Sequence, residues 1–166
     1  KDDVDFFIIE TMSSIDEAVN AVEALSNFNK KILLCFCLLE GDGTKLFSGE
    51  DLSKACDLIQ IDKISGLCLN CSQFEDISIG LDILKKYGLP FGALPNNFQS
   101  VKPLKLGMSV DNIKKRNDIL IEDFVNYSNI WLKKGCTILG GCCEITPSYI
   151  NGCLLYTSDA ADESSS

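Results

Sequence analysis

Hydrophobic runs and amphipathic stretches alternate along the chain, and this alternation predicts an α/β protein. Five apolar runs have the length and composition of strands buried on both faces, at residues 4–9, 31–39, 64–70, 89–94 and 136–139. Between them lie segments with apolar residues at helical spacing, near residues 15–25, 50–60, 75–86 and 121–134. Strands and helices in this order form a parallel sheet with right-handed crossovers.

Residues at the ends of these segments support the helix boundaries. Ser14 and Glu17 have the spacing of a capping box. Gly88 and Gly135 follow predicted helices, at the position where a left-handed glycine commonly ends a helix. Pro147 suits the first turn of a helix, so we expect a further helix after the last strand.

Two segments have neither periodicity. Residues 40–49 contain Gly-Asp-Gly and are predicted to form a loop. Residues 96–118 are longer, and loops of that length are usually functional or mobile. We interpret the basic residues of this loop as a solvent-exposed face, with contact to an anionic substrate as the alternative. They are Lys102, Lys105, Lys114, Lys115 and Arg116.

Two architectures fit the pattern, a doubly wound sheet and part of a (β/α)8 barrel. No Gly-x-Gly-x-x-Gly follows any strand, so nothing supports a dinucleotide fold. Both architectures place ligand sites at the carboxyl ends of their strands. The residues predicted there are Glu10, Asn70, Cys71, Asn96, Cys142 and Cys143.

Composition removes several classes of function. The net charge is −9, which disfavours nucleic acid as a partner. Histidine is absent, so no Ser-His or Cys-His nucleophile pair exists. The longest apolar run has eight residues, at 32–39, too few to span a membrane, and the chain does not open with the apolar segment of a signal peptide. We therefore expect neither a nucleic-acid nor a membrane partner.

Cysteine is the residue type that suggests chemistry. Nine cysteines at irregular spacing indicate a reducing compartment, the cytoplasm, rather than a disulfide framework. Three of them, Cys71, Cys142 and Cys143, are predicted at one rim, where three thiolates could bind Zn²⁺ and leave its fourth position open. The alternative is that they are small buried hydrophobic residues. We expect such packing for the rest of the first 152 residues: Cys35, Cys37, Cys56, Cys68 and Cys136.

Four segments resemble the homocysteine S-methyltransferase family, whose homocysteine-binding domain is a zinc-containing (β/α)8 barrel. They are residues 5–12 (DFFIIETM), 17–19 (EAV), 66–71 (GLCLNC) and 135–147 (GCTILGGCCEITP). The resemblance covers residues 3–152 in family order. It implies that Cys71, Cys142 and Cys143 hold zinc and that Glu10 binds the homocysteine ammonium. Without the resemblance, Glu10 could equally be a solvent-exposed carboxylate.

The resemblance also implies two further substrate-binding residues, Asn70 and Asn96. Leu94, two residues before Asn96, stands where the family has an aromatic residue, so the wall of the site differs there. No catalytic residue beyond the zinc site is implied.

The resemblance further implies a fold and a boundary. Residues 1–152 correspond to the C-terminal part of the barrel, strands four to eight with their intervening helices. Residues 153–163 (CLLYTSDAADE) resemble a translated transposase sequencing adapter. We therefore expect residues 153–166 to be a non-native, disordered tail that packs against nothing.

The implied activity is methyl transfer to the homocysteine thiolate, forming methionine. The donor would be an onium compound, S-methylmethionine, S-adenosylmethionine or betaine. The alternative is a catalytically inert, truncated barrel with a structural zinc site or none. A cysteine-rich redox protein is less well supported because no Cys-x-x-Cys pair is present. The sequence predicts no oligomeric state.

Overall fold

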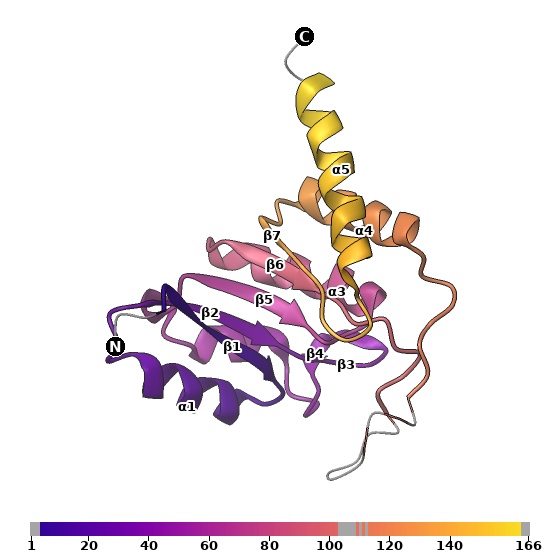
Figure 1. Cartoon of the computed structure of the whole chain (residues 1–166). Helices are drawn as coiled ribbons and strands as arrows, with labels where there is room; N and C mark the ends of the chain where they lie inside the picture. The colour runs from indigo at the N-terminus through magenta and orange to yellow at the C-terminus, as the bar shows by residue number, and fades with distance from the viewer. Residues whose placement is uncertain (1–3, 103–108, 110, 112, 164–166) are drawn as a thin grey trace.

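A five-stranded parallel sheet forms the centre of the molecule (Figure 1). The computed structural model describes residues 4–102, 109, 111 and 113–163 of the chain. Its strands lie in the order β1-β2-β5-β6-β7, and each neighbouring pair is parallel. Their bounds are β1 (Phe6–Met12), β2 (Lys31–Phe36), β5 (Gly66–Asn70), β6 (Phe91–Leu94) and β7 (Ile138–Leu139).

The helices follow the strands in sequence, and successive helices contact one another. They are α1 (Ile15–Leu25), α2 (Leu52–Leu58), α3 (Phe74–Leu84), α4 (Ile121–Lys134) and α5 (Pro147–Glu163), with single 3₁₀ turns η1 (Ile61–Lys63) and η2 (Lys85–Tyr87). The main strands lie side by side in chain order, without the reversal that defines a doubly wound sheet. Of the two architectures that the sequence left open, the strand order therefore favours the (β/α)8 barrel.

The two faces of the sheet have different environments. Alternate strand residues such as Ile9, Leu34 and Leu67 are buried in the core that includes the helix residues Phe74 and Trp131. On the first strand, the opposite face is open: Phe6 is 52% exposed and Ile8 is 45% exposed. The strand predicted at residues 4–9 is present, as Phe6–Met12, but the expectation that it is buried on both faces is wrong, because β1 lies at the sheet edge with β2 as its one neighbour among the described strands.

Three small residues and one isoleucine form a close-packed row across this second face. Cys35 is the cross-strand partner of Cys68, Cys68 that of Gly92, and Gly92 that of Ile138. A Cβ atom on Gly92 would lie 2.5 Å from Cβ of Ile138 and 2.9 Å from Sγ of Cys68, so glycine is required there. The predicted core packing of Cys35, Cys37, Cys56, Cys68 and Cys136 is confirmed, since all five are buried.

The helix ends largely follow the local sequence signals. Ser14 is the N-cap of α1 and its side chain accepts a hydrogen bond from the amide of Glu17. The Glu17 carboxylate accepts from the amide of Ser13, one residue earlier than the capping-box pattern predicts. Gly88 (φ 69°) and Gly135 (φ 101°) are left-handed caps, as expected.

The prediction of a loop at residues 40–49 is wrong. The chain forms an antiparallel hairpin there, with β3 (Leu38–Leu39) and β4 (Asp42–Leu46). Leu38 and Leu46 pair across the hairpin and are buried. The hairpin also packs on α3, where Gly43 fits closely against the backbone of Asp76. Tertiary packing therefore gives this polar segment a structure that its own periodicity does not indicate.

The last helix differs from the expected disordered tail. Helix α5 continues to Glu163, and Cys153 is 9% exposed. Its thiol donates a hydrogen bond to the hydroxyl of Ser128 on α4, at 3.2 Å. The expectation that nothing from residue 153 onward packs is thus wrong for Cys153, which lies one helical turn after the buried Tyr149. Leu154 and Leu155 are 63% and 59% exposed.

None of the described helices is both long and apolar enough to cross a bilayer.

Candidate metal centre

Three cysteine sulfurs meet at the carboxyl end of the sheet. Cys71 directly follows β5, and Cys142 and Cys143 follow β7. The Cys143 sulfur lies 3.9 Å from that of Cys71 and 3.8 Å from that of Cys142. All three sulfurs lie within 4.8 Å of one another. The predicted convergence of these residues at one rim is therefore observed.

The segment after β6 joins the two loops that carry these cysteines. Each cysteine makes a backbone hydrogen bond to this part of the chain. The bonds run from Cys71 N to Leu94 O (3.1 Å), from Cys142 N to Pro95 O (2.8 Å) and from Asn97 N to Cys143 O (2.9 Å). Cys71 itself has a left-handed backbone, with φ 49°. The backbone, rather than side-chain contacts alone, thus sets the spacing of the sulfurs.

The charges of the three thiols depend on one another. The pKa of Cys142 is lowered to about 6, chiefly because the Cys71 thiol donates a hydrogen bond to its sulfur. The same hydrogen bond raises the pKa of Cys71, and burial raises that of Cys143. Like-charge repulsion therefore favours one thiolate among the three, and full ionisation requires a cation.

The spacing of the sulfurs fits a zinc ion. Zn–S bonds of about 2.3 Å in tetrahedral geometry place sulfurs about 3.8 Å apart. The two separations that involve the Cys143 sulfur, 3.8 and 3.9 Å, match that value. Cys71 and Cys142 are half-buried whereas Cys143 is exposed, so the cluster is open on one side.

Glu10 lies on the open face of β1, because its neighbour Ile9 points into the helix-covered core. The side chain of Glu10 is exposed. The pKa of Cys142 is lowered mainly by Cys71, and the negative charge of Glu10 opposes that lowering. Glu10 is therefore near enough to the sulfurs for its negative charge to act on the Cys142 thiol.

Asn70 was predicted to bind substrate, but the structure directs its side chain to Thr11. Asn70 is buried. Its Oδ1 accepts from the amide of Thr11 at 3.0 Å, and its Nδ2 donates to the hydroxyl of Thr11 at 2.9 Å. Both ends of the amide thus contact one residue at the end of β1.

Asn96 retains an unpaired polar atom. Its Oδ1 accepts from the amide of Phe98 at 3.0 Å. Its Nδ2 is buried and has no hydrogen-bond partner in the part of the chain that the structure describes. A buried donor without a partner is costly, so this N–H marks Asn96 as a candidate for ligand contact.

A cavity of about 200 Å³ adjoins Cys71. Its lining is largely apolar and comes from the ends of β1 and β2, the hairpin and the long loop. The residues are Thr11, Ser13, Cys37, Phe47, Cys71 and Val101. Sequence analysis missed Thr11, Ser13 and Phe47 because neither residue type nor spacing marks them. Thr11 and Ser13 follow the strand predicted at residues 4–9, and this position was the one signal that could have indicated them.

The basic residues of the long loop are mostly paired with acids. Arg116 donates hydrogen bonds to Glu75 at 2.8 Å, to Asp118 at 2.7 Å and to Gln73 at 2.9 Å. Lys102 pairs with Glu40 and Lys115 with Glu144. Lys105 lies outside the described residues. Lys114 has no ion pair within the described residues. The pairs of the other three cations link the loop to α3 and neighbouring segments, and they do not favour an anionic substrate there.

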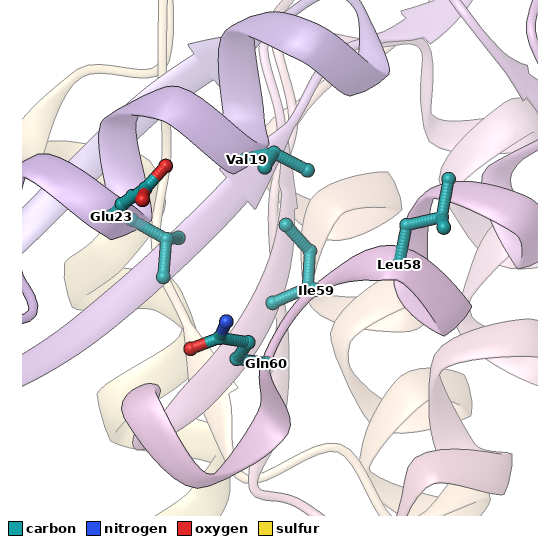
Figure 2. A pocket seen from close by; sticks show the side chains of 6 residues that line it. Val19, Glu23, Leu58, Ile59 and Gln60 are labelled. Carbon is teal, nitrogen blue, oxygen red and sulfur yellow. The ribbon is translucent and has the colours of Figure 1, made fainter.

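A second pocket lies on the outer surface between α1 and α2 (Figure 2). It has a volume of about 90 Å³ and shares no residue with the cysteine cluster or its cavity. Glu23 and Gln60 are the polar side chains that Figure 2 shows there, beside the apolar Val19, Leu58 and Ile59. It offers no combination of groups for metal binding or nucleophilic chemistry, so the cysteine cluster is the stronger candidate.

Comparison with known proteins gives a consistent result. A family model described as homocysteine S-methyltransferase matches residues 1–153. A selenocysteine methyltransferase from Astragalus bisulcatus is 27% identical over 155 residues, which cover 90% of this chain and 43% of that protein. Homocysteine S-methyltransferase 2 from Zea mays is 30% identical over 152 residues, 88% of this chain and 42% of that protein. The chain spans less than half the length of these relatives.

Solved structures show the same fold. The apo form of the homocysteine methyltransferase MmuM from Escherichia coli superposes with a TM-score of 0.69 at 22% identity, covering 92% of this chain and 49% of that one. The metallated form of the same enzyme gives a TM-score of 0.69 and covers 91% of this chain and 44% of that one.

Proposed function

Because the chain belongs to the homocysteine S-methyltransferase family, we propose that the full-length protein transfers a methyl group to the thiol of homocysteine. The product is methionine. The observation that carries this proposal is the meeting of three cysteine sulfurs within 4.8 Å at the carboxyl end of the sheet. Enzymes named for this family methylate a thiol. Three thiolates could bind a metal ion, and that ion could activate the thiol of the substrate.

Cys71, Cys142 and Cys143 would hold a Zn²⁺ ion. Their spacing supports this assignment, and the E. coli relative is described in a metallated form. When bound, zinc would supply a fourth position at which the homocysteine thiol is kept deprotonated. No residue of this chain is needed as a general base at the methyl group, which agrees with the absence of histidine.

Glu10 and Asn96 would position the substrate. The charge of the Glu10 carboxylate acts on Cys142, and a carboxylate suits the ammonium of homocysteine. The buried, unpaired Nδ2 of Asn96 suits an oxygen acceptor of the bound ligand. The apolar cavity beside Cys71 would exclude water from the reacting sulfur.

The methyl donor is an onium compound in this proposal. The homocysteine thiolate forms a bond to the methyl carbon, and the bond between that carbon and the positive sulfur or nitrogen breaks. The electron pair of the broken bond stays with the donor, which leaves as a neutral group. S-methylmethionine, S-adenosylmethionine and betaine each fit this balance.

The chain would form strands four to eight of the barrel, residues 1–152. Its sequential strand order and its partial coverage of the relatives support this placement. The reducing cytoplasm suits nine free cysteines. Residues 153–166 would be non-native, on the strength of their adapter-like sequence. The chain alone would then be inert, because the sheet of the described residues is open at β1 and β7.

A selenol is a second candidate acceptor, because two of the relatives are named as selenocysteine methyltransferases. A selenol is more acidic than a thiol and would need less activation at the metal.

The test is a methyl-transfer assay with the zinc-loaded full-length protein. Homocysteine and selenocysteine are each combined with each of the three donors, and the methylated products are quantified by mass spectrometry. We expect methionine from at least one donor and loss of that product after chelation of zinc. Absence of both methylated products with every donor, in a folded and metal-loaded protein, would overturn the proposal.

A further inference from the structure

The end of β1 contains a bulge at the residues that approach the metal cluster. Ile9 is the partner of Leu34 on β2, and the next pairing joins Met12 to Phe36. Three steps along β1 thus match two along β2, and Glu10 and Thr11 lie within the irregular part. Bulges of this kind change the direction of a side chain, often next to a functional site.

Thr11 has a backbone conformation that its side chain disfavours. Its φ is 62°, in the left-handed region. A β-branched residue is rarely found there, because the crowded Cβ meets its own backbone. Such a conformation persists where surrounding contacts hold it.

Asn70 supplies those contacts from a strand that is not the neighbour of β1. The strand β2 lies between β1 and β5, yet the Asn70 side chain reaches across it to Thr11. It accepts from the Thr11 amide at 3.0 Å and donates to the Thr11 hydroxyl at 2.9 Å. A carboxamide can do both at once, whereas a carboxylate can only accept.

Asn70 is itself fixed next to a proposed metal ligand. It precedes Cys71, and its carbonyl accepts from the Ser72 hydroxyl at 2.9 Å, which in turn accepts from the Leu38 amide at 2.8 Å. Thr11 and Cys71 line the same cavity. One short segment of β5 therefore determines both the position of a sulfur and the shape of the strand end that carries Glu10.

We infer that Asn70 is a positioning residue, which acts through Thr11 to hold Glu10 at the distance from the sulfur cluster that the amino group of the acceptor requires. It sets this distance without contacting the acceptor. The inference rests on the proposed function for its activity readout. It also has a readout that does not depend on activity, because the hydrogen bond from the Thr11 amide can be measured directly.

The first experiment compares Asn70→Ala, the double variant Asn70→Ala/Thr11→Gly and the control Asn20→Ala in the zinc-loaded full-length protein. Asn20 is an exposed asparagine of α1 that bonds its own helix. We expect Asn70→Ala to raise the KM for homocysteine about tenfold, the effect of losing two hydrogen bonds, with zinc content and donor KM unchanged. Thr11→Gly should restore most of the loss, because glycine adopts positive φ without support.

The outcomes separate the alternatives. If the KM stays high in the double variant, Asn70 contacts the acceptor directly and the inference is wrong. Loss of zinc in Asn70→Ala would also overturn it, because the residue would then serve the metal site. An unchanged KM for homocysteine in Asn70→Ala would overturn the inference as well.

A second experiment measures hydrogen exchange at the Thr11 amide. We expect protection in the wild type and in Asn20→Ala, and faster exchange in Asn70→Ala. Equal protection in all three would overturn the inference even if the protein had no methyltransferase activity. If Asn70→Ala does not fold, Thr11→Val takes its place, because it removes the hydroxyl acceptor and keeps the side-chain shape. Thr11→Val should raise the homocysteine KM with zinc retained, and a wild-type KM would contradict the inference.

Discussion

The sulfur of Cys71 lies 3.9 Å from the sulfur of Cys143, although 72 positions separate the two residues in the sequence. One follows β5 and the other follows the short β7, with β6 between the two strands. An ion bound to both sulfurs would join the two loops across the intervening strand. The metal is therefore expected to stabilise the fold as well as to serve the reaction.

The first prediction concerns this shared ligand set. Replacing Cys143 by serine should lower bound zinc from about one ion per chain to a trace, because a hydroxyl is a far poorer zinc ligand than a thiolate. The unfolding temperature of the zinc-loaded protein should fall with it. Plasma mass spectrometry and calorimetry measure the two effects. The matched control is Cys56→Ser, a buried cysteine of α2, which should keep its zinc. Full zinc content in Cys143→Ser would show that Cys143 is not a zinc ligand.

Glu10 gives a second prediction. Glu10→Gln keeps the size of the side chain and removes its charge, so homocysteine should bind about tenfold or more weakly through loss of a charge-assisted hydrogen bond. Zinc content and donor KM should not change. Isothermal titration of homocysteine into the zinc-loaded protein tests this, with Glu23→Gln in the separate outer pocket as the control. Loss of zinc in Glu10→Gln would show that the carboxylate serves the metal instead.

A third prediction concerns pH and the long loop. Arg116 lowers the pKa of Glu75 and of Asp118 by hydrogen bonding to their carboxylates. Carboxyls with lowered pKa stabilise the fold above their unfolded pKa values, near 4, and this stabilisation is lost as the pH falls through the lower native values. The unfolding temperature should thus drop on acidification below about pH 4.5. Arg116→Ala should flatten this pH dependence, while the surface variant Lys133→Ala should retain it. Parallel curves for all three proteins would contradict the prediction.

Packing of the sheet gives a fourth prediction. Gly92→Ala would place a methyl group 2.5 Å from Ile138 and 2.9 Å from Cys68, so the row across the sheet must shift. We expect a loss of about 1–3 kcal/mol in the free energy of unfolding, as for other overpacked cores. Gly140→Ala is the comparison, because its new methyl group would meet the side chain of Leu94 at 3.2 Å, a contact that can relax. Denaturant titration should therefore place Gly140→Ala closer to the wild type than Gly92→Ala.

The edge strand leads to the fifth prediction. Phe6 and Ile8 are exposed on the edge strand of the described sheet, whose outer edge is a template for association. The 166-residue chain, expressed alone, should self-associate and transfer no methyl group. Light scattering should show smaller particles for Phe6→Lys, because a charge on an edge strand opposes pairing. A monomeric chain with cooperative unfolding and methyltransferase activity would be the opposite result.

Much of this arrangement could be predicted because it depends on short-range patterns. Buried runs and amphipathic segments specify the alternation of strands and helices, and parallel strands bring their carboxyl ends to one rim. Cys71 and Cys143 could therefore be placed together without knowledge of their distance. The hairpin at Leu38–Leu46 could not, because its stability comes from packing on α3 rather than from its own pattern.

The interaction between Asn70 and Thr11 was also beyond prediction from sequence. It crosses an intervening strand, and the left-handed backbone of Thr11 has no signature in a residue type that avoids that conformation. Burial of Cys153 depends on how α5 lies against α4, and periodicity within α5 does not specify that contact.

All three sulfurs of the cluster come from loops after β5 and β7, within a single stretch of sequence between residues 71 and 143. The three thiols therefore belong to one continuous portion of the sequence. A protein engineer could fuse that portion to a different partner sequence and keep the candidate metal site together.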